Sequence, residues 1–249
     1  MIKLNSLKLG EKSYLKYFAL KFLILLLVAD IIYILLYVST WLPSSSYLSK
    51  AISEVVTYQE LLWITEEQSY AEVFQYLKEL WIALILGFGA WQRKSFLFIA
   101  WALLFSYLLM DDSLSIHEII GSKISSLLQF QDAFRLRAVD FGEVVVSATV
   151  AIVFLIVISW AYFRSSSTER KYSQFLTFFL LALAVTGIFL DLIHVVVSDN
   201  LYFNLIFALL EDGGEQIIMS FALSFVYAID WQYDLHREKF LKKHSTRSY

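Results

Sequence analysis

Long apolar stretches constrain this chain more than any other feature of its sequence. Residues 17–42 form a run that only Lys21 and Asp30 interrupt with charge, and comparable runs recur further along the chain. One bilayer crossing takes about 20 apolar residues in an α-helix. Because 59% of the residues are hydrophobic and the mean hydropathy is +0.63, far above an ordinary soluble domain, most of the apolar mass has to face lipid.

These runs predict an all-α, polytopic transmembrane helix bundle with about six spans in a single membrane domain. The predicted spans cover residues 17–42, 70–91, 95–112, 140–163, 174–197 and 203–230. An outer amphipathic segment is expected at 43–69 and a basic cytoplasmic tail at 231–249. The stretch 111–128 either continues the third span or forms a second interfacial helix.

Lysine and arginine residues predict that both ends of the chain are cytoplasmic. Fifteen of these residues lie in segments on the side of the N-terminus, against four on the opposite side. Short loops rich in lysine and arginine remain on the cytoplasmic side of a membrane. The first run is too long for a cleaved signal peptide, so it is interpreted as a retained signal anchor. The predicted location is the bacterial inner membrane.

Charge, cysteine content and motifs exclude several classes of function. The net charge of −3, without a basic stripe, gives no reason to expect a nucleic-acid partner. The chain has no cysteine, which excludes disulfides and thiolate sites. It also lacks a nucleotide-binding loop, a G-x-S-x-G elbow and an H-E-x-x-H helix, so ATP hydrolysis, serine hydrolysis and zincin chemistry have no support.

Acidic residues recur inside the predicted spans at helical spacing. A charged side chain at the centre of a spanning helix costs about 2.5–3.5 kcal/mol, so each one is a functional candidate. The polar stripes contain Asp30, then Glu72 and Glu79, Asp140 and Glu143, Asp191 and His194, and finally Glu211 and Glu215. Asp30 is interpreted as a packing residue that pairs with a basic residue or a tyrosine. The other stripes together predict a polar site near the outer face.

The densest polar cluster is the sequence DDSLSIHE at the outer end of the third span. Asp111 and Glu118 lie seven residues apart, on one helical face, with Asp112 and His117 beside them. His117 has a more ordinary interpretation, because it is close enough to the membrane interface to be hydrated. The cluster nevertheless predicts that this end of the third span belongs to the polar site.

The carboxylate and histidine residues predict a divalent metal site. Asp191 precedes His194 by three residues, a spacing that lets one helix present both side chains to a metal ion, although His194 could instead bond a neighbouring helix. Histidines with several carboxylates suit zinc, iron or manganese. The predicted metal ligands are Asp112, His117, Asp191, His194 and Glu211; the predicted catalytic residues are Glu118 and Glu215; and Asp111, Glu143, Glu72 and Glu79 are expected to line the same polar cavity.

The order of DDSLSIHE and a late acidic helix with Glu211 and Glu215 resembles a group of uncharacterised bacterial polytopic inner-membrane proteins. These carry an acidic pair, then His-Glu after the third span, then a Glu-rich helix. The pair here is Asp111-Asp112, where the resemblance implies Asp-Glu. The chain differs from the alkaline ceramidase and progestin-receptor-like superfamily, because it lacks a third intramembrane histidine and an H-x-x-x-H pair.

Three functions from different classes are compatible with this sequence. The first is a metal-dependent membrane enzyme acting on a lipid-like amphiphile, with metal-bound water as nucleophile and Glu118 or Glu215 as general base. The second is a proton or cation transporter or channel, in which the acidic residues relay charge. The third is a non-catalytic subunit that docks an unknown protein partner.

Overall fold

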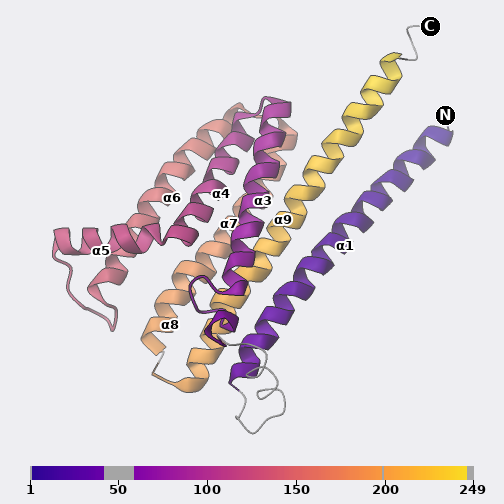
Figure 1. The fold of residues 1–249 in the computed structure, drawn as a ribbon. Coiled ribbons are helices and arrows are strands. Elements are labelled where there is room, and N and C mark those ends of the chain that lie inside the picture. Colours follow the sequence, from indigo (N-terminus) through magenta and orange to yellow (C-terminus); the bar gives the residue numbers. More distant parts are fainter. Residues whose placement is uncertain (1, 42–58, 198, 246–249) are drawn as a thin grey trace.

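The computed structural model describes residues 2–41, 59–197 and 199–245, and every regular element among them is helical (Figure 1). The elements are α1 (Ile2–Thr40), a 3-10 turn (Gln59–Leu62), α3 (Tyr70–Arg93), α4 (Phe96–Leu114), α5 (Ile116–Leu128), α6 (Ala138–Arg164), α7 (Ser167–Ala184), a π-helical turn (Val185–Leu190), α8 (Asp191–Val197) and α9 (Leu201–Ser245). Helices α1 and α9 lie side by side, next to a group formed by α3, α4, α6 and α7 (Figure 1).

Five helical stretches within the described residues are long and apolar enough to cross a bilayer. They are Phe18–Thr40, Tyr70–Arg93, Phe96–Leu114, Ala138–Arg164 and Ser167–Val196. The sixth predicted span, 203–230, is helical as part of α9, and this helix continues through most of the predicted tail to Ser245. The predicted all-α membrane bundle is confirmed. Most of the expected outer segment, residues 43–58, lies outside the described residues.

The apolar side chains of α6 and α7 are largely uncovered. In α6, Leu155 and Ile156 are 67% and 64% exposed, and Phe178 of α7 is 65% exposed. An apolar surface of this extent on a water-soluble protein would be a binding or aggregation site. On helices long enough to cross a bilayer it is the surface that lipid covers.

The closely packed core lies between α3, α4 and α9. Trp101 and Phe105 of α4, Ile82 of α3 and Leu223 of α9 are almost inaccessible. The indole N–H of Trp101 donates to the hydroxyl of Ser173 in α7, at 2.9 Å. Since a buried donor without an acceptor is costly, this bond lets an indole sit in the core, and it ties α7 to α4.

Serine residues set the boundaries of α3 and α4. Ser69 begins α3 by accepting a hydrogen bond from the backbone N–H of Glu72, and Ser95 caps α4 in the same way. Ser115, with φ of 46°, ends α4. Helix α5 therefore starts in a new direction and projects sideways from the end of α4 (Figure 1), so the stretch 111–128 does not simply continue the third span.

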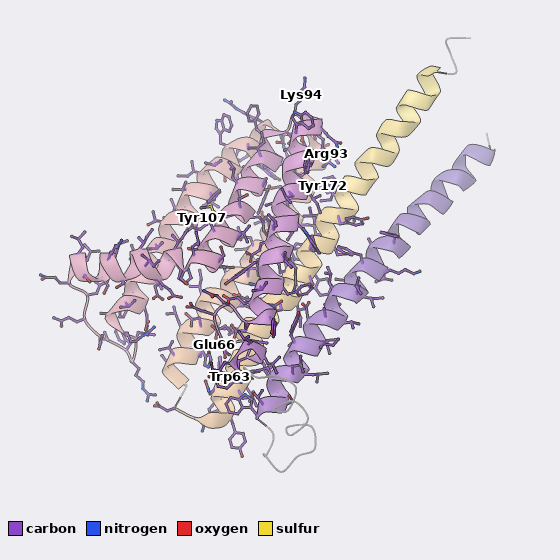
Figure 2. All side chains as sticks on the ribbon, viewed as in Figure 1. Trp63, Glu66, Arg93, Lys94, Tyr107 and Tyr172 are labelled. Carbon is purple, nitrogen blue, oxygen red and sulfur yellow. The ribbon has the colours of Figure 1, made fainter. Side chains whose placement is uncertain are left out.

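The two ends of the bundle carry different residues. Arg93 and Lys94 lie at one end, whereas Trp63 and Glu66 lie at the other (Figure 2). The first residues of α1 and the last residues of α9 extend toward the end that carries Arg93 (Figure 1). This arrangement agrees with the lysine and arginine pattern of the sequence, while the orientation in a membrane stays a prediction.

Candidate functional site

A polar cavity of about 860 Å³ lies near the junction of α4 and α5, beside the start of α6. Helices α4, α5, α6, α8 and α9 all contribute to its lining. The ionisable lining residues are Asp112, His117, Glu118, Lys123, Arg137, Asp140, Glu143, Asp191, Glu211 and Glu215. Seven carboxyl groups therefore surround one space with only two permanently cationic side chains.

An apolar groove of about 440 Å³ adjoins the cavity between α4, α6 and α7. Leu104 and Leu108 of α4, Phe154 and Leu155 of α6 and Leu180 of α7 are among its walls. Seven residues line both spaces: Asp112, His117, Asp140, Glu143, Gly187, Asp191 and Glu215. The cavity and the groove are therefore two parts of one site, polar at the end of the bundle and apolar along its length.

Asp111 fixes the position of His117 across the break between α4 and α5. One carboxylate oxygen accepts the backbone N–H of His117 at 2.9 Å, and the other lies 3.3 Å from its Nδ1. Tyr107 donates its hydroxyl to the same carboxylate at 3.3 Å. The hydrogen bond to Asp111 is the main cause that raises the pKa of His117 to about 9.

Arg137 and Asp140 form an ion pair at the start of α6. The guanidinium donates to Oδ1 of Asp140 at 2.7 and 2.9 Å, and the backbone N–H of Arg137 donates to Oδ2 at 2.7 Å. This bonding caps the helix and raises the pKa of Arg137. One of the two permanent cations of the cavity is thus already bound to a carboxylate.

A π-helical turn makes room for Glu215. The turn, Val185–Leu190, joins α7 to α8 and contains Gly187. A Cβ atom at Gly187 would collide with Oε1 of Glu215, and Gln75 donates its amide to the other oxygen at 3.3 Å. The absence of a side chain at Gly187 therefore lets the carboxyl group of Glu215 reach the junction of cavity and groove. Single π-turns are frequent at functional sites.

His194 does not line the cavity and instead joins α8 to α9. Its Nδ1 lies 2.7 Å from a carboxylate oxygen of Glu211, and its Nε2 lies 2.7 Å from Oδ1 of Asn204. Asp191, three residues earlier, does line the cavity. Within the part of the chain that the structure describes, no three histidine, aspartate or glutamate side chains are grouped as metal ligands. The predicted metal site stays a prediction.

Glu79 is a fully buried acid at the wall of the groove. Its side chain has no exposed surface, and neither oxygen makes a hydrogen bond of normal geometry with a described residue. The carboxyl group of Asp112 nevertheless lies within hydrogen-bonding reach of it. The carboxyl groups of Asp112 and Glu215 are close enough to act on it electrostatically. Glu72, seven residues before Glu79, lines neither the cavity nor the groove. Its carboxylate accepts a hydrogen bond from the backbone N–H of Gln68 at the start of α3.

A second buried polar network, which the sequence analysis did not predict as a whole, lies deeper in the bundle. Lys78 Nζ donates to Asp30 Oδ1 at 2.6 Å and to the backbone and side-chain oxygens of Gln216 at 2.9 and 2.8 Å. The hydroxyl of Ser220 donates to the other oxygen of Asp30 at 2.5 Å. Both charged side chains are 0% exposed. The partner expected for Asp30 is therefore Lys78, which follows Gln75 by three residues in α3.

Apolar helices, an acidic cavity and an adjoining groove define this chain as a helical membrane protein with one composite site. It belongs to the family described as Domain of unknown function (DUF8692), which matches residues 19–229. This range contains all the lining residues of cavity and groove. A search of curated proteins and a search of solved structures found no match. Membership of an uncharacterised family agrees with the resemblance seen in the sequence, and bacterial origin stays a prediction.

Proposed function

We propose that this protein is a membrane enzyme that acts on the polar head of a lipid-like amphiphile. One observation carries the proposal: the acidic cavity and the apolar groove share seven lining residues. A molecule with a polar head and an apolar chain would occupy both spaces at once. Binding sites of this kind combine an apolar wall with a few convergent polar groups.

The groove gives such a molecule a route from the bilayer. Leu155 and Leu181 line the groove and are also 67% and 60% exposed on the faces of α6 and α7. Because lipid covers these faces, a chain can enter sideways without crossing water. The end of the bundle opposite Arg93 and Lys94 holds the cavity, so the positive-inside rule supports an outer-leaflet site in a bacterial inner membrane.

Glu215 and Glu118 are the proposed acid and base. Glu215 is half-buried at the junction, whereas Glu118 lies on the more exposed side of the cavity. Partial burial and the nearby carboxyl group of Glu67 raise the pKa of Glu118. Two carboxyl groups in different environments can divide the roles of general base and general acid. For an ester or amide bond in the head, Glu215 would take a proton from water as the water oxygen attacks the carbonyl carbon. Glu118 would protonate the alcohol or amine that leaves as the carbon–oxygen or carbon–nitrogen bond breaks.

The experiment incubates the detergent-purified full chain with extracted membrane lipids and follows products by mass spectrometry. We expect Glu215→Gln to lower turnover by about 100-fold or more, the usual size of a general acid–base contribution. Glu66→Gln is the matched control, because Glu66 is exposed at the same end of the bundle and outside the cavity. Lipid turnover that survives in Glu215→Gln would contradict the catalytic assignment.

A divalent metal ion is part of the proposal as a separate, testable component. Asp112, Asp191 and Glu211, with His117, would supply oxygen and nitrogen ligands suited to zinc, iron or manganese. Metal content of the wild type is compared with that of His117→Ala and Asp191→Asn, each of which removes a proposed ligand. Near-stoichiometric metal that is lost in both variants supports metal-assisted hydrolysis. A folded, active protein without metal leaves the carboxyl groups as the only catalysts.

Cation transport is the second candidate, and the position of Glu79 favours it. Asp112, Glu215 and Lys78 are all close enough to its carboxyl group to act on it electrostatically, and Lys78 is in turn paired with Asp30. Ionisable side chains inside a membrane frequently form proton relays. Proteoliposomes with a pH-sensitive dye inside test this: proton uptake that Glu79→Gln abolishes would favour transport over the enzyme.

A further inference from the structure

Building on the function proposed above, we propose that the head of the amphiphile carries a positive charge, as a primary amine or a quaternary ammonium does. The cavity presents seven carboxyl groups against Lys123, Arg137 and His117. When all three bases are charged and every carboxyl group is ionised, the acids exceed the bases by four; each acid that stays protonated lowers this excess by one. A cationic head is the occupant that this excess of negative charge attracts.

Two of the three bases of the cavity already contact a carboxylate. Arg137 donates two hydrogen bonds to Oδ1 of Asp140, although its side chain is 70% exposed, and His117 is paired with Asp111. Lys123 remains, on the exposed side of α5. A phosphate or sulfate head would therefore meet one unpaired cation, Lys123, one paired cation, Arg137, and several carboxylates, and like charges at close distance are costly. Because Arg137 already contacts Asp140 and His117 already contacts Asp111, the cavity favours a positively charged head over a negatively charged one.

Glu79 gives an independent indication of a cationic or hydrogen-bond-donating ligand. It is an acid with no exposed surface, its oxygens make no hydrogen bond of normal geometry with the described residues, and apart from the acid Asp112, which is within reach, no described side chain is a hydrogen-bond partner for it. It lines the groove beside Asp112 and Glu215. A buried polar group without a partner is unusual and indicates a missing one. An ammonium head at the junction of cavity and groove would supply N–H donors or a positive charge to Glu79, Asp112 and Glu215 together.

The groove distinguishes this occupant from a free inorganic cation. A metal ion or a small ammonium ion would occupy part of the cavity and leave the groove without a ligand. The groove adds about 440 Å³ of mainly apolar space that begins at the same seven residues, and burial of a hydrocarbon chain there is favourable. From detergent or a bilayer the gain is smaller, so the head determines the selectivity.

The test compares three probes that share one hydrocarbon chain: hexadecylamine, hexadecanol and hexadecyl phosphate. Each probe is titrated onto the full-length protein in a neutral detergent, and the bound molecules are counted by native mass spectrometry. We expect the amine to bind at least about tenfold more tightly than the other two. Glu215→Gln and Asp191→Asn should each reduce this preference, whereas Glu66→Gln should keep it. Two variants are used so that misfolding of one, seen as a lowered thermal midpoint, leaves the other informative.

Each other outcome has a distinct meaning. Equal binding of the three probes keeps the amphiphile site but overturns the cationic head. A preference for the phosphate, above all after addition of zinc or manganese, also overturns it and favours a metal-bearing cavity. Equal binding of tetramethylammonium and the long-chain amine would overturn the role of the groove. If no probe binds to folded protein, the proposed function itself fails.

Discussion

At the scale of single residues, two glycines illustrate how the site depends on missing side chains. A Cβ at Gly187 would collide with the carboxyl group of Glu215, whereas a Cβ at Gly87 in α3 would meet nothing within 4 Å. Glycine in a helix costs roughly 0.5–1 kcal/mol relative to alanine. Glycine at position 187 is therefore less favourable for the helix, but it leaves space for the carboxyl group of Glu215, the proposed catalytic residue.

We expect Gly187→Ala to displace Glu215 and to reduce binding of the long-chain amine by about tenfold or more, because overpacking moves the side chain that must yield. Binding is measured by native mass spectrometry and folding by the thermal midpoint. Gly87→Ala is the matched control and should bind as the wild type does, with equal or higher stability. Unchanged binding in a folded Gly187→Ala protein would show that the position of Glu215 does not matter.

The Asp111–His117 pair predicts a pH dependence of stability. Contact with Asp111 raises the pKa of His117 to about 9, above the value of about 6.5 for an unfolded chain. The stabilising contribution is therefore complete below about pH 6.5 and is lost as the pH rises through about 9. In Asp111→Asn the pKa of His117 should fall and the decline should begin at lower pH.

Thermal midpoints measured in detergent between about pH 6 and 10 check this prediction. The control is Asp199→Asn, which alters an ion pair with Arg135 in which both side chains are mostly exposed, and surface pairs contribute little. It should keep the pH profile of the wild type. A profile in Asp111→Asn that matches the wild type would mean that the pair does not stabilise the fold.

At the scale of helices, the sequence predicted most faces correctly but not every direction. Spacing placed Asp140 and Glu143 on one face of α6, and both line the cavity. The same rule placed Asp191 with His194, yet only Asp191 faces the cavity, because the preceding π-turn and the contacts to α9 decide the direction of α8. A π-turn depends on tertiary packing and leaves no periodic pattern that the sequence alone reveals.

The contact between α5 and α6 depends on a pair of glycines. A Cβ at Gly142 would collide with the backbone oxygen of Gly121, and a Cβ at Gly121 would lie 2.7 Å from the backbone nitrogen of Glu143. The two backbones thus approach more closely than any side chain allows, as small residues permit in membrane helix packing. This contact holds α5 over the cavity, since both helices contribute lining residues.

We expect Gly142→Ala to destabilise the protein by about 1–3 kcal/mol, or to move α5 away from α6, because backbone atoms cannot yield as side chains do. Hydrogen exchange of the α5 amides and the thermal midpoint measure the two effects. Gly213→Ala is the control, since its Cβ would make an ordinary contact at 3.4 Å with Ile34. Wild-type protection of α5 in Gly142→Ala would contradict the assigned role of the glycine pair.

At the scale of the whole molecule, the buried Asp30–Lys78 pair connects helices that are far apart in the sequence. Asp30 lies in α1, Lys78 in α3, and Gln216 and Ser220 in α9. The apolar runs predicted the spans and suggested that Asp30 has a packing partner. The polar stripe that spacing gave for α3 contained Glu72 and Glu79 but not Lys78, and only the packing of three helices shows that Lys78 meets Asp30.

Breaking this pair from one side should be far more damaging than replacing it. Lys78→Met leaves Asp30 buried without a cation, and such a loss costs about 3–5 kcal/mol. The double variant Asp30→Leu with Lys78→Met removes both charges and should recover much of the stability, because apolar replacements of buried pairs are frequently neutral. Thermal midpoints of the wild type, the two single variants and the double variant form a complete cycle.

The double variant also separates the two candidate functions at the level of the intact protein. If the pair only holds α1, α3 and α9 together, a folded double variant should bind the long-chain amine and turn over lipid as the wild type does, since neither residue lines the cavity or the groove. If the pair relays protons below Glu79, the same folded variant should lose proton uptake in proteoliposomes. Retained lipid turnover without any proton uptake in the wild type would leave the enzyme as the surviving proposal.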